Sequence, residues 1–418
     1  MEERGRIFRF LASTNNTFHW AGRTVAMAAM LALGACATPY DPPKWDPQEE
    51  AKGIAFQGLR GYLRKGETLN VLWVHGMCRH DMDWAIERSR LVGEALGLKG
   101  APPKPVPRAV APVQTATARF STDDGDLQIT FLIWSPLTDG HRNALKFDTP
   151  DEKRPPYPFE RASLNAALKR SLLNDCFVDA VVYSGPQGDP IRTAMRTVLC
   201  DTLGGAARSD ESCAIAPGKG SRIVLVAESL GSKILSDAVR HVVQQPGAAP
   251  SPAATALNER LSGIDALFLI SNQVPLLDTA DRPAPKSAQV QGAARIAATP
   301  GESSLFDALS LIADARPARL TLGLTDSAPI QVTAFSDPND LLSYRLPTER
   351  LAIPEIRLAN VIVSNAPTYF GWVERPDNAH CGYAWNPYVI GFVVDGYTPG
   401  KPWTKGVNST KNSCFGGP

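Results

Sequence analysis

Residues 221–237 constrain the fold of this chain more than any other stretch. Residues 223–226 are aliphatic and mostly β-branched, which is typical of a strand buried on both faces of a parallel sheet. From Leu230 onward the apolar residues recur at helical spacing, so a helix follows almost at once. The chain therefore turns directly from a strand into a helix, and Ser229 lies at that turn.

The residues around this turn are small where the two elements have to pack closely. Ala227 and Gly231 flank Ser229 at a distance of two residues on either side. The turn lifts the Ser229 hydroxyl above the carboxyl end of the sheet. It also puts Ser229 at a helix N-terminus, where free N–H groups favour a developing negative charge. The simpler alternative is a serine that caps the helix.

The pattern from Ala227 to Gly231 resembles the nucleophile elbow, G-x-S-x-G, of the α/β-hydrolase superfamily, with alanine at the first glycine position. The resemblance covers about residues 69–396 and is nearest in character to esterases and lipases. It implies an α/β fold with a doubly wound, mostly parallel sheet, and Ser229 as the nucleophile. Strands that alternate with helices along the chain favour the same fold class.

The pattern of apolar residues predicts the other elements of such a fold. Further strands are expected over residues 54–63, 69–74, 127–134, 266–271, 330–335 and 358–363. Helices are expected over residues 85–96, 161–173, 177–203 and 304–313, and from residue 385 onward. The proline-rich residues 101–112 are expected to form a surface loop. We expect an insertion or lid over about residues 101–220, because this stretch is longer than a crossover needs.

The dipeptide His75-Gly76 directly follows the strand expected over residues 69–74. In α/β hydrolases, a turn of this kind after the third strand supplies one backbone N–H group of the oxyanion hole. The resemblance therefore implies Met77 as a donor, with Gly76 allowing the backbone to approach. The second implied donor is Leu230, the residue after the nucleophile. Two such preorganised N–H groups lower the barrier of acyl transfer substantially.

The same region offers a competing interpretation as a metal site. Its possible ligands are His75, Cys78, His80, Asp81 and Asp83. Their mixed types and irregular spacing do not fit a zinc motif, and no CxxC or Cys/His spacing elsewhere does. We therefore expect neither a metal nor a cofactor.

A serine hydroxyl needs a base within hydrogen-bond reach, and the base needs an acidic partner. In this superfamily the order along the chain is serine, acid, histidine. The acid is expected in residues 335–342, after a late strand, and the resemblance implies Asp340 because an apolar pair follows it. Asp337 is the alternative acid. Whichever of the two is not the acid is expected to bond its own backbone in the turn.

The chain has six histidines, which limits the choice of the base. Five of them lie in the leader, the oxyanion turn, the polar insertion or the elbow helix: His19, His75, His80, His141 and His241. His380 alone follows the last expected strand, so its place in the chain order implies the catalytic base. The simpler alternative is a loop histidine that is hydrogen-bonded to backbone.

Residues 1–35 have the features of a bacterial lipoprotein signal peptide. Arginines precede an apolar run over residues 25–33 that is too short to span a membrane comfortably. The following Leu33-Gly34-Ala35-Cys36 resembles the lipobox, which implies cleavage before Cys36 and lipidation of that cysteine. Ala37 favours the outer membrane, with the protein facing the periplasm or the cell surface. An ordinary secretory signal with a structural Cys36 is the alternative.

The polar, proline-rich residues 36–53 are expected to form a tether, and residues 54–418 the hydrolase domain. Six cysteines lie beyond Cys36, and an even number in an oxidising compartment indicates disulfides. The pairs Cys200–Cys213 and Cys381–Cys414 would close a short loop and tie down the tail. They are two choices among about fifteen possible connectivities.

The balance of charged residues excludes one class of partner. The chain has 43 basic and 42 acidic residues, so no basic field favours nucleic acid as a partner. The sequence predicts a serine hydrolase, anchored to the bacterial envelope, that cleaves carboxylic esters of small or lipid-like molecules through an acyl-enzyme. An amidase, a peptidase or an acyltransferase would use the same three residues. A non-catalytic envelope lipoprotein of the same fold is the alternative from another class.

Overall fold

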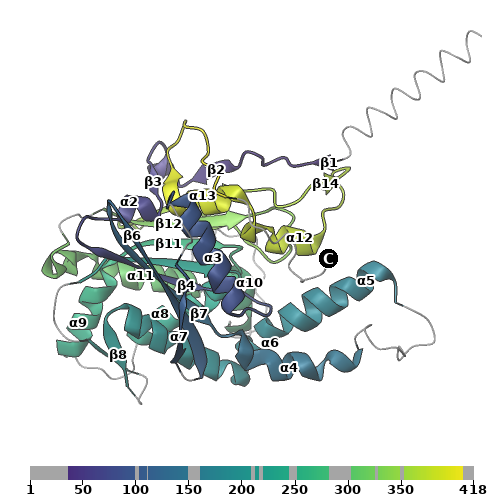
Figure 1. The fold of residues 1–418 in the computed structure, drawn as a ribbon, viewed down its shortest axis with the longest axis horizontal. Helices are drawn as coiled ribbons and strands as arrows, with labels where there is room; N and C mark the ends of the chain where they lie inside the picture. The colour runs from purple at the N-terminus through teal and green to yellow at the C-terminus, as the bar shows by residue number, and fades with distance from the viewer. Residues whose placement is uncertain are drawn as a thin grey trace, which may run out of the picture.

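The computed structural model describes residues 36–98, 103–110, 112–148, 161–208, 212–215, 220–243, 252–281, 303–324, 328–348 and 353–407. Within these residues the largest sheet has nine strands (Figure 1). From one edge to the other they are β2 (Lys44–Pro47), β13 (Ile356–Ile362), β12 (Ile330–Ser336), β11 (Ile264–Ile270), β10 (Ile223–Glu228), β4 (Thr68–Val74), β7 (Gly125–Ile133), β6 (Val113–Thr122) and β5 (Val106–Val110).

The central strands of this sheet, from β13 to β7, are parallel, and the strands at both edges are antiparallel. Every residue of β10, β11 and β12 is buried. Side chains of β10 alternate between two apolar cores, with Leu225 in one and Val226 in the other. A strand with a core on each side has no polar face, which explains the continuous apolar runs in the sequence.

Helices cover both faces of the sheet (Figure 1). The helices that contribute to the first core are α6 (Val178–Ser184), α7 (Asp189–Thr202), α8 (Gly231–Val243), α9 (Pro252–Leu261), α10 (Val274–Asp281) and α11 (Ser304–Ala315). Those that contribute to the second core are α2 (Leu59–Tyr62), α3 (Met82–Ala95) and α13 (Pro387–Asp395). The expected mixed α/β class with a large, mostly parallel sheet is therefore confirmed.

The remaining elements are short. Three small two-stranded sheets pair β1 (Cys36–Ala37) with β14 (Thr368–Tyr369), β3 (Phe56–Gln57) with β15 (Gly396–Tyr397), and β8 (Gly205–Ala207) with β9 (Cys213–Ile215). The other helices are α4 (Asp139–Ala144), α5 (Ser163–Ala167) and α12 (Pro376–Cys381). Helical turns of other kinds are η1 (Glu49–Ala51), η2 (Ser135–Thr138), η3 (Lys146–Asp148), η4 (Leu168–Phe177), η5 (Pro186–Gly188), η6 (Arg316–Leu322) and η7 (Gly382–Ala384).

The expected insertion over residues 101–220 is smaller than the sequence predicts. Its first part forms β5, β6 and β7, which extend the main sheet at one edge, so the surface loop expected over residues 101–112 is also wrong. Polar residues alternate with buried ones along β6, and this half-buried pattern gives no continuous apolar run. The edge strand β5 contains Pro107, which an edge tolerates. Helix α7 packs against α8, β4 and β7, so it belongs to a helical layer of the sheet.

The tether expected over residues 36–53 is also partly in the sheet. Strand β2 pairs antiparallel with β13, and Trp45 packs against Phe56 and Phe392 with ring centroids 5.0 and 5.9 Å apart. Burial of this indole explains why a proline-rich segment is held in place. The first strand expected over residues 54–63 is reduced to β3, and helix α2 follows it.

The disulfides are partly as expected. Cys200 and Cys213 are bonded, and so are Cys78 and Cys176, a pair that the sequence does not suggest because 98 positions separate them. Cys381 is also disulfide-bonded, while Cys414 lies outside the described residues.

Residues 1–35, with the expected signal peptide and His19, lie outside the described residues as well. Among the helices of the described residues, none is long and apolar enough to cross a bilayer.

Candidate active site

Ser229 lies between the end of β10 and the first residue of α8, at the strand-to-helix turn that the sequence predicts. Its backbone has φ of +52°, a left-handed conformation that residues other than glycine rarely adopt. The Ser229 N–H donates a 2.7 Å hydrogen bond to the carbonyl of Ile270 on the neighbouring strand. The surrounding backbone therefore holds a strained serine in place, as is common at functional sites.

Close contacts between two turns require glycine at one position in each of them, Gly76 after β4 and Gly231 after Ser229. A Cβ atom on Gly76 would lie 2.5 Å from the Ser229 Cβ, and one on Gly231 would lie 2.8 Å from the carbonyl oxygen of His75. Both distances are shorter than atoms can approach. The turn after β4 and the turn at Ser229 therefore pack directly on each other.

Three side chains from distant parts of the chain form a hydrogen-bonded series at this point. Ser229 Oγ lies 3.1 Å from His380 Nε2. His380 Nδ1 lies 2.9 and 3.1 Å from the two carboxylate oxygens of Asp340. Asp340 comes from the turn after β12 and His380 from α12, and all three side chains are buried. With the proton on Nδ1 held by Asp340, Nε2 is free to accept the serine proton.

The carboxyl group of Asp340 is held in its ionised form. Burial alone would raise its pKa, but the adjacent imidazole of His380 and hydrogen bonds from Leu342 and Ser271 outweigh burial and lower the pKa. Tyr383 also donates a hydrogen bond to this carboxylate, at 3.1 Å. The pKa of Tyr383 itself is raised, chiefly by burial, so its hydroxyl keeps its proton.

Ser271 is part of this network, although it belongs to none of the motifs in the sequence that predict the site. It follows β11 with φ of +57°, and its hydroxyl donates a 2.8 Å hydrogen bond to Asp340 Oδ2. The same hydroxyl lies 3.2 Å from His380 Nδ1. A small polar residue at the carboxyl end of the strand next to β10 is a signal that the sequence contains, because ligands bind at that edge of parallel sheets.

Asp337, the alternative acid, is turned away from His380 and holds the loop instead. Its two oxygens accept hydrogen bonds from the backbone N–H groups of Asn339 and Asn365, at 2.9 and 2.6 Å. Burial raises the pKa of Asp337. It also interacts with Glu374, whose pKa is raised to about 7, first by burial and then by the charge of Asp337. Asp337 therefore has the turn-forming contacts expected for the residue that does not pair with the histidine.

The two expected oxyanion donors, Met77 and Leu230, come from the two turns that pack on each other at Ser229. Met77 follows the glycine that touches Ser229, and Leu230 is the next residue after it. Both residues are buried. Within the described residues neither backbone N–H group has a hydrogen-bond acceptor. Buried donors without partners are uncommon in folded proteins, and these two are available to a ligand oxygen.

His75 has a structural place in the turn after β4. Its Nδ1 lies 2.7 Å from the Gly76 carbonyl, and its Nε2 accepts a hydrogen bond from the Trp134 N–H at 3.1 Å. Burial, followed by the neighbouring His80, lowers the pKa of His75 well below its ordinary value, so the ring is neutral. Both ring nitrogens are engaged, which leaves none for a metal. Among the described residues, no three potential ligand side chains are grouped as a metal site requires.

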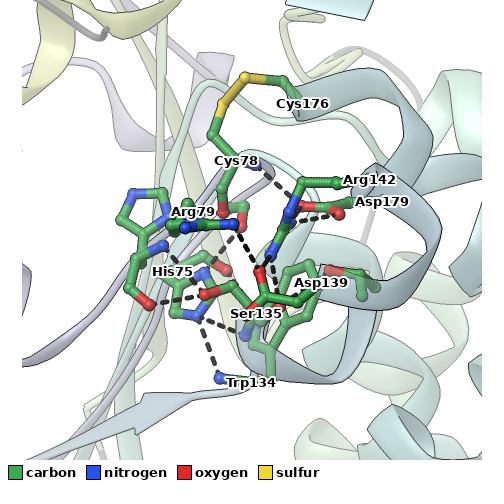
Figure 2. Close-up of polar contacts among 12 residues, drawn as sticks. His75, Cys78, Arg79, Trp134, Ser135, Asp139, Arg142, Cys176 and Asp179 are labelled. Carbon is green, nitrogen blue, oxygen red and sulfur yellow. Dashed lines mark hydrogen bonds and ion pairs between the residues drawn. A yellow bond between two sulfur atoms is a disulfide. The ribbon is translucent and has the colours of Figure 1, made fainter. Parts of the chain in front are cut away.

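A second layer of contacts holds this turn from the side of the expected insertion (Figure 2). The Cys78 N–H donates to Asp179 Oδ2 at 3.0 Å, and Cys78 is also bonded to Cys176. Arg142 reaches Asp179 at 2.6 Å and the Ser135 carbonyl at 2.6 Å. Burial raises the pKa of Asp179 to about 6, although Arg142 opposes the shift. Helices α4 and α6 therefore support the turn after β4.

A cavity of about 120 Å³ opens beside Ser229 and His380. Helices α3 and α13 supply part of its apolar wall, through Leu91 and Ile390 among others. Within the described residues, no side chain from positions 101–220 lines it, so the expected lid does not form its wall. His141 and His241 lie elsewhere, on α4 and α8, and are exposed.

The polar part of the cavity wall is a buried ion pair. Glu228, the residue before the serine, accepts hydrogen bonds from Arg88 Nε at 2.7 Å and Nη2 at 3.1 Å. Trp73 Nε1 donates to the same carboxylate at 2.8 Å. Burial alone would raise the pKa of Glu228, but Arg88 outweighs it and the pKa is lowered. The pair is therefore neutral as a unit, and it adds to a polar part of the wall that also includes Arg79 and His80.

Comparison of the chain with models of protein families, with curated proteins and with solved structures found no match.

Proposed function

We propose that this chain is a serine hydrolase of the α/β-hydrolase type that cleaves carboxylic esters through an acyl-enzyme. One observation carries the proposal: the Ser229 hydroxyl, the His380 imidazole and the Asp340 carboxylate form a continuous hydrogen-bonded series. The strained backbone of Ser229 and the two unpartnered N–H groups beside it add support. A serine that only capped a helix would need none of these features.

In the first step, Ser229 Oγ attacks the ester carbonyl carbon while His380 Nε2 takes the hydroxyl proton. The carbonyl oxygen becomes an oxyanion, which the N–H groups of Met77 and Leu230 stabilise. Asp340 accepts a hydrogen bond from the Nδ1–H group, which stays on the ring, and its charge stabilises the imidazolium that forms. The tetrahedral intermediate then collapses, the bond to the alcohol oxygen breaks, and His380 gives its proton to the departing alcohol.

In the second step, water replaces the alcohol. His380 Nε2 takes a proton from the water, whose oxygen attacks the carbonyl carbon of the acyl-enzyme. The second intermediate collapses with cleavage of the bond to Ser229 Oγ, and His380 returns the proton to the serine. The carboxylic acid leaves and the site is restored. These steps use only residues of this chain.

The cavity limits the acyl group. Its volume of about 120 Å³ lies well below the roughly 300–1,000 Å³ of pockets that hold drug-sized ligands. Apolar side chains of α3 and α13 form part of its wall. Esters of short carboxylic acids are therefore the proposed substrates, with the alcohol part outside the cavity.

The location of the protein in the cell is part of the proposal. The lipobox-like residues before Cys36 would place a lipid on that cysteine and anchor the hydrolase in the bacterial envelope, with the outer membrane favoured by Ala37. The disulfides Cys78–Cys176 and Cys200–Cys213 are typical of proteins outside the cytoplasm.

Replacement of Ser229 by alanine tests the chemistry. We expect Ser229→Ala to remove hydrolysis of p-nitrophenyl acetate and labelling by a fluorophosphonate probe, because the nucleophile is lost. Ser121→Ala, which changes an exposed serine on β6, should keep both. Equal activity in the Ser229→Ala protein would rule the mechanism out. An intact, folded protein that neither labels nor turns over any ester would favour a binding role, and turnover of amides alone would favour an amidase.

A further inference from the structure

A cluster of large apolar side chains is exposed in the segment that precedes α12. The exposed fractions are 46% for Tyr369, 65% for Phe370, 90% for Trp372 and 59% for Val373. Single exposed apolar residues are common, but four within five consecutive positions form a patch that usually marks an interaction surface. We call residues 368–373 the aromatic hairpin.

The backbone of the aromatic hairpin is ordered by its own hydrogen bonds. The Tyr369 N–H donates to the Val373 carbonyl at 2.7 Å, and the Trp372 N–H donates back to the Tyr369 carbonyl at 3.0 Å. The turn between them has φ of +54° at Phe370 and +69° at Gly371. A phenylalanine in a left-handed conformation is strained, and the ring of Phe370 is exposed.

The aromatic hairpin lies against the residue that is proposed to carry the lipid. Strand β14 pairs antiparallel with β1, so Tyr369 is opposite Cys36 and Thr368 is opposite Ala37. The Thr368 hydroxyl adds a 2.9 Å hydrogen bond to the Ala37 carbonyl. Figure 1 shows β1 and β14 together at one end of the molecule, beside α12.

We propose that the aromatic hairpin inserts into the surface of a lipid bilayer and sets the orientation of the enzyme on it. Trp and Tyr rings favour the interface between lipid and water, because they combine an apolar ring with a polar group. Lipid chains on Cys36 would hold the adjacent backbone at that same interface. The inference rests on the proposed anchor for its location, and its occupant is the bilayer itself.

The aromatic hairpin also connects the membrane to the candidate active site. Glu374, the next residue, accepts a 2.7 Å hydrogen bond from Asn339 in the turn that carries Asp340. Helix α12, with His380, begins only three positions after Val373. A bilayer against the aromatic hairpin therefore lies close to the catalytic histidine, and the proposed substrates are esters that reach the site from the membrane surface.

Tryptophan quenching in vesicles tests the inference. The mature, lipidated protein is reconstituted into vesicles of phosphatidylethanolamine and phosphatidylglycerol whose acyl chains carry bromine, a short-range quencher. The difference between wild type and Trp372→Phe gives the signal of Trp372. We expect that signal to be quenched, and the corresponding signal of Trp403, from Trp403→Phe, to remain. An unquenched Trp372 in a protein that carries its lipid would overturn the inference and leave the anchor standing.

A second measurement separates the aromatic hairpin from the anchor. Mass spectrometry of the peptide that contains Cys36 shows whether the acyl groups are present. If they are absent, the anchor fails, and binding of the protein to the same vesicles decides the inference alone. Phe370→Ser with Trp372→Ser should then weaken binding by roughly tenfold or more, and Phe147→Ser, which changes an equally exposed ring, should not.

The main rival occupant is a second copy of the chain. In that case the protein would form a dimer at micromolar concentration without lipid, and Trp372→Ser would dissociate it in an analytical ultracentrifuge. That outcome would overturn membrane docking. A monomer with and without the substitution, together with vesicle binding, supports it.

Discussion

At the scale of single residues, the environment of Asp340 decides how the site works. Four groups share its two oxygens: the ring of His380, the hydroxyls of Ser271 and Tyr383, and the backbone N–H of Leu342. Each donor favours the ionised carboxylate. Ser271 is the member that also reaches His380 Nδ1, so it fixes the relative position of acid and base.

Replacement of Ser271 tests this positioning role. Ser271→Ala removes a hydrogen bond to a charged group, so we expect kcat for a soluble ester to fall by roughly tenfold. The pKa of Asp340 is lowered in the intact site, and loss of a donor raises it. Activity requires the ionised carboxylate. As the pH is lowered, the Ser271→Ala enzyme should therefore lose activity at a higher pH than the wild type does.

Ser336→Ala, which removes a buried hydroxyl from the neighbouring strand β12, is the matched control and should leave the profile in place. A Ser271→Ala enzyme with lower kcat and an unmoved acid limb would indicate a structural role only.

At the scale of elements, the turn after β4 depends on helices that lie far away in the sequence. Asp179 on α6 accepts the Cys78 N–H and pairs with Arg142 on α4, and both side chains are almost fully buried. A buried ion pair of this kind is costly to break, because the remaining charge loses its buried partner. The turn that carries Met77 is thus held from outside its own strand.

Substitution of Asp179 should have two consequences for stability. Asp179→Asn removes the buried anionic partner of Arg142 and leaves it only the half-exposed Asp139, so we expect a loss of at most about 3 kcal/mol in the free energy of unfolding at neutral pH. The folded-state pKa of about 6 lies above the ordinary 3.8, so the folded protein binds this proton more tightly than the unfolded chain. The contribution of Asp179 therefore makes the unfolding free energy fall as pH rises from 3.8 to about 6.

Denaturant unfolding at several pH values measures both effects. Asparagine does not titrate, so the variant should lose the part of the slope that Asp179 supplies. Asp175→Asn, which changes an exposed carboxylate on η4, should keep the slope and the stability. An Asp179→Asn protein with the same pH dependence as wild type would show that another group causes it.

At the scale of the whole molecule, the sheet separates two cores, and the candidate site lies where both meet the carboxyl ends of the parallel strands. The turns after β4, β10, β11 and β12 contribute Met77, Ser229, Ser271 and Asp340 at this edge. The cavity beside them opens toward α3 and α13, which belong to the second core. The packing of these two helices therefore contributes to the size of the cavity.

Enlargement of the cavity should change the preferred acyl group. We expect wild-type enzyme to cleave p-nitrophenyl acetate faster than the octanoate, because the cavity is small. Ile390→Ala removes part of the α13 wall, so the ratio of kcat/KM for octanoate over acetate should rise roughly tenfold. Ile86→Ala, on the exposed side of α3, should leave the ratio unchanged. A wild type that prefers octanoate would contradict the assignment of the cavity.

Elements that are formed by local sequence patterns could be predicted from the sequence, and elements that depend on partners distant in the chain could not. Strands β4, β10, β11, β12 and β13 are rich in apolar residues, because they are buried on both faces, and the sequence shows them directly. Strands β2, β5 and β6 lie at or next to the edges, where polar residues and prolines are tolerated, so their sequences resemble loops. Their place in the sheet depends on partners that are distant in the chain.

The sequence by itself determined the strand-turn-helix at Ser229, the glycines beside it, and the order in which Ser229, Asp340 and His380 follow one another, because these are local patterns with a fixed period or position. Tertiary structure alone decided that Asp340 rather than Asp337 contacts His380, that Ser271 joins them, and that Cys78 bonds to Cys176. Those contacts join residues from separate elements. Their distances depend on how the whole sheet and its helices pack, which no short stretch of sequence contains.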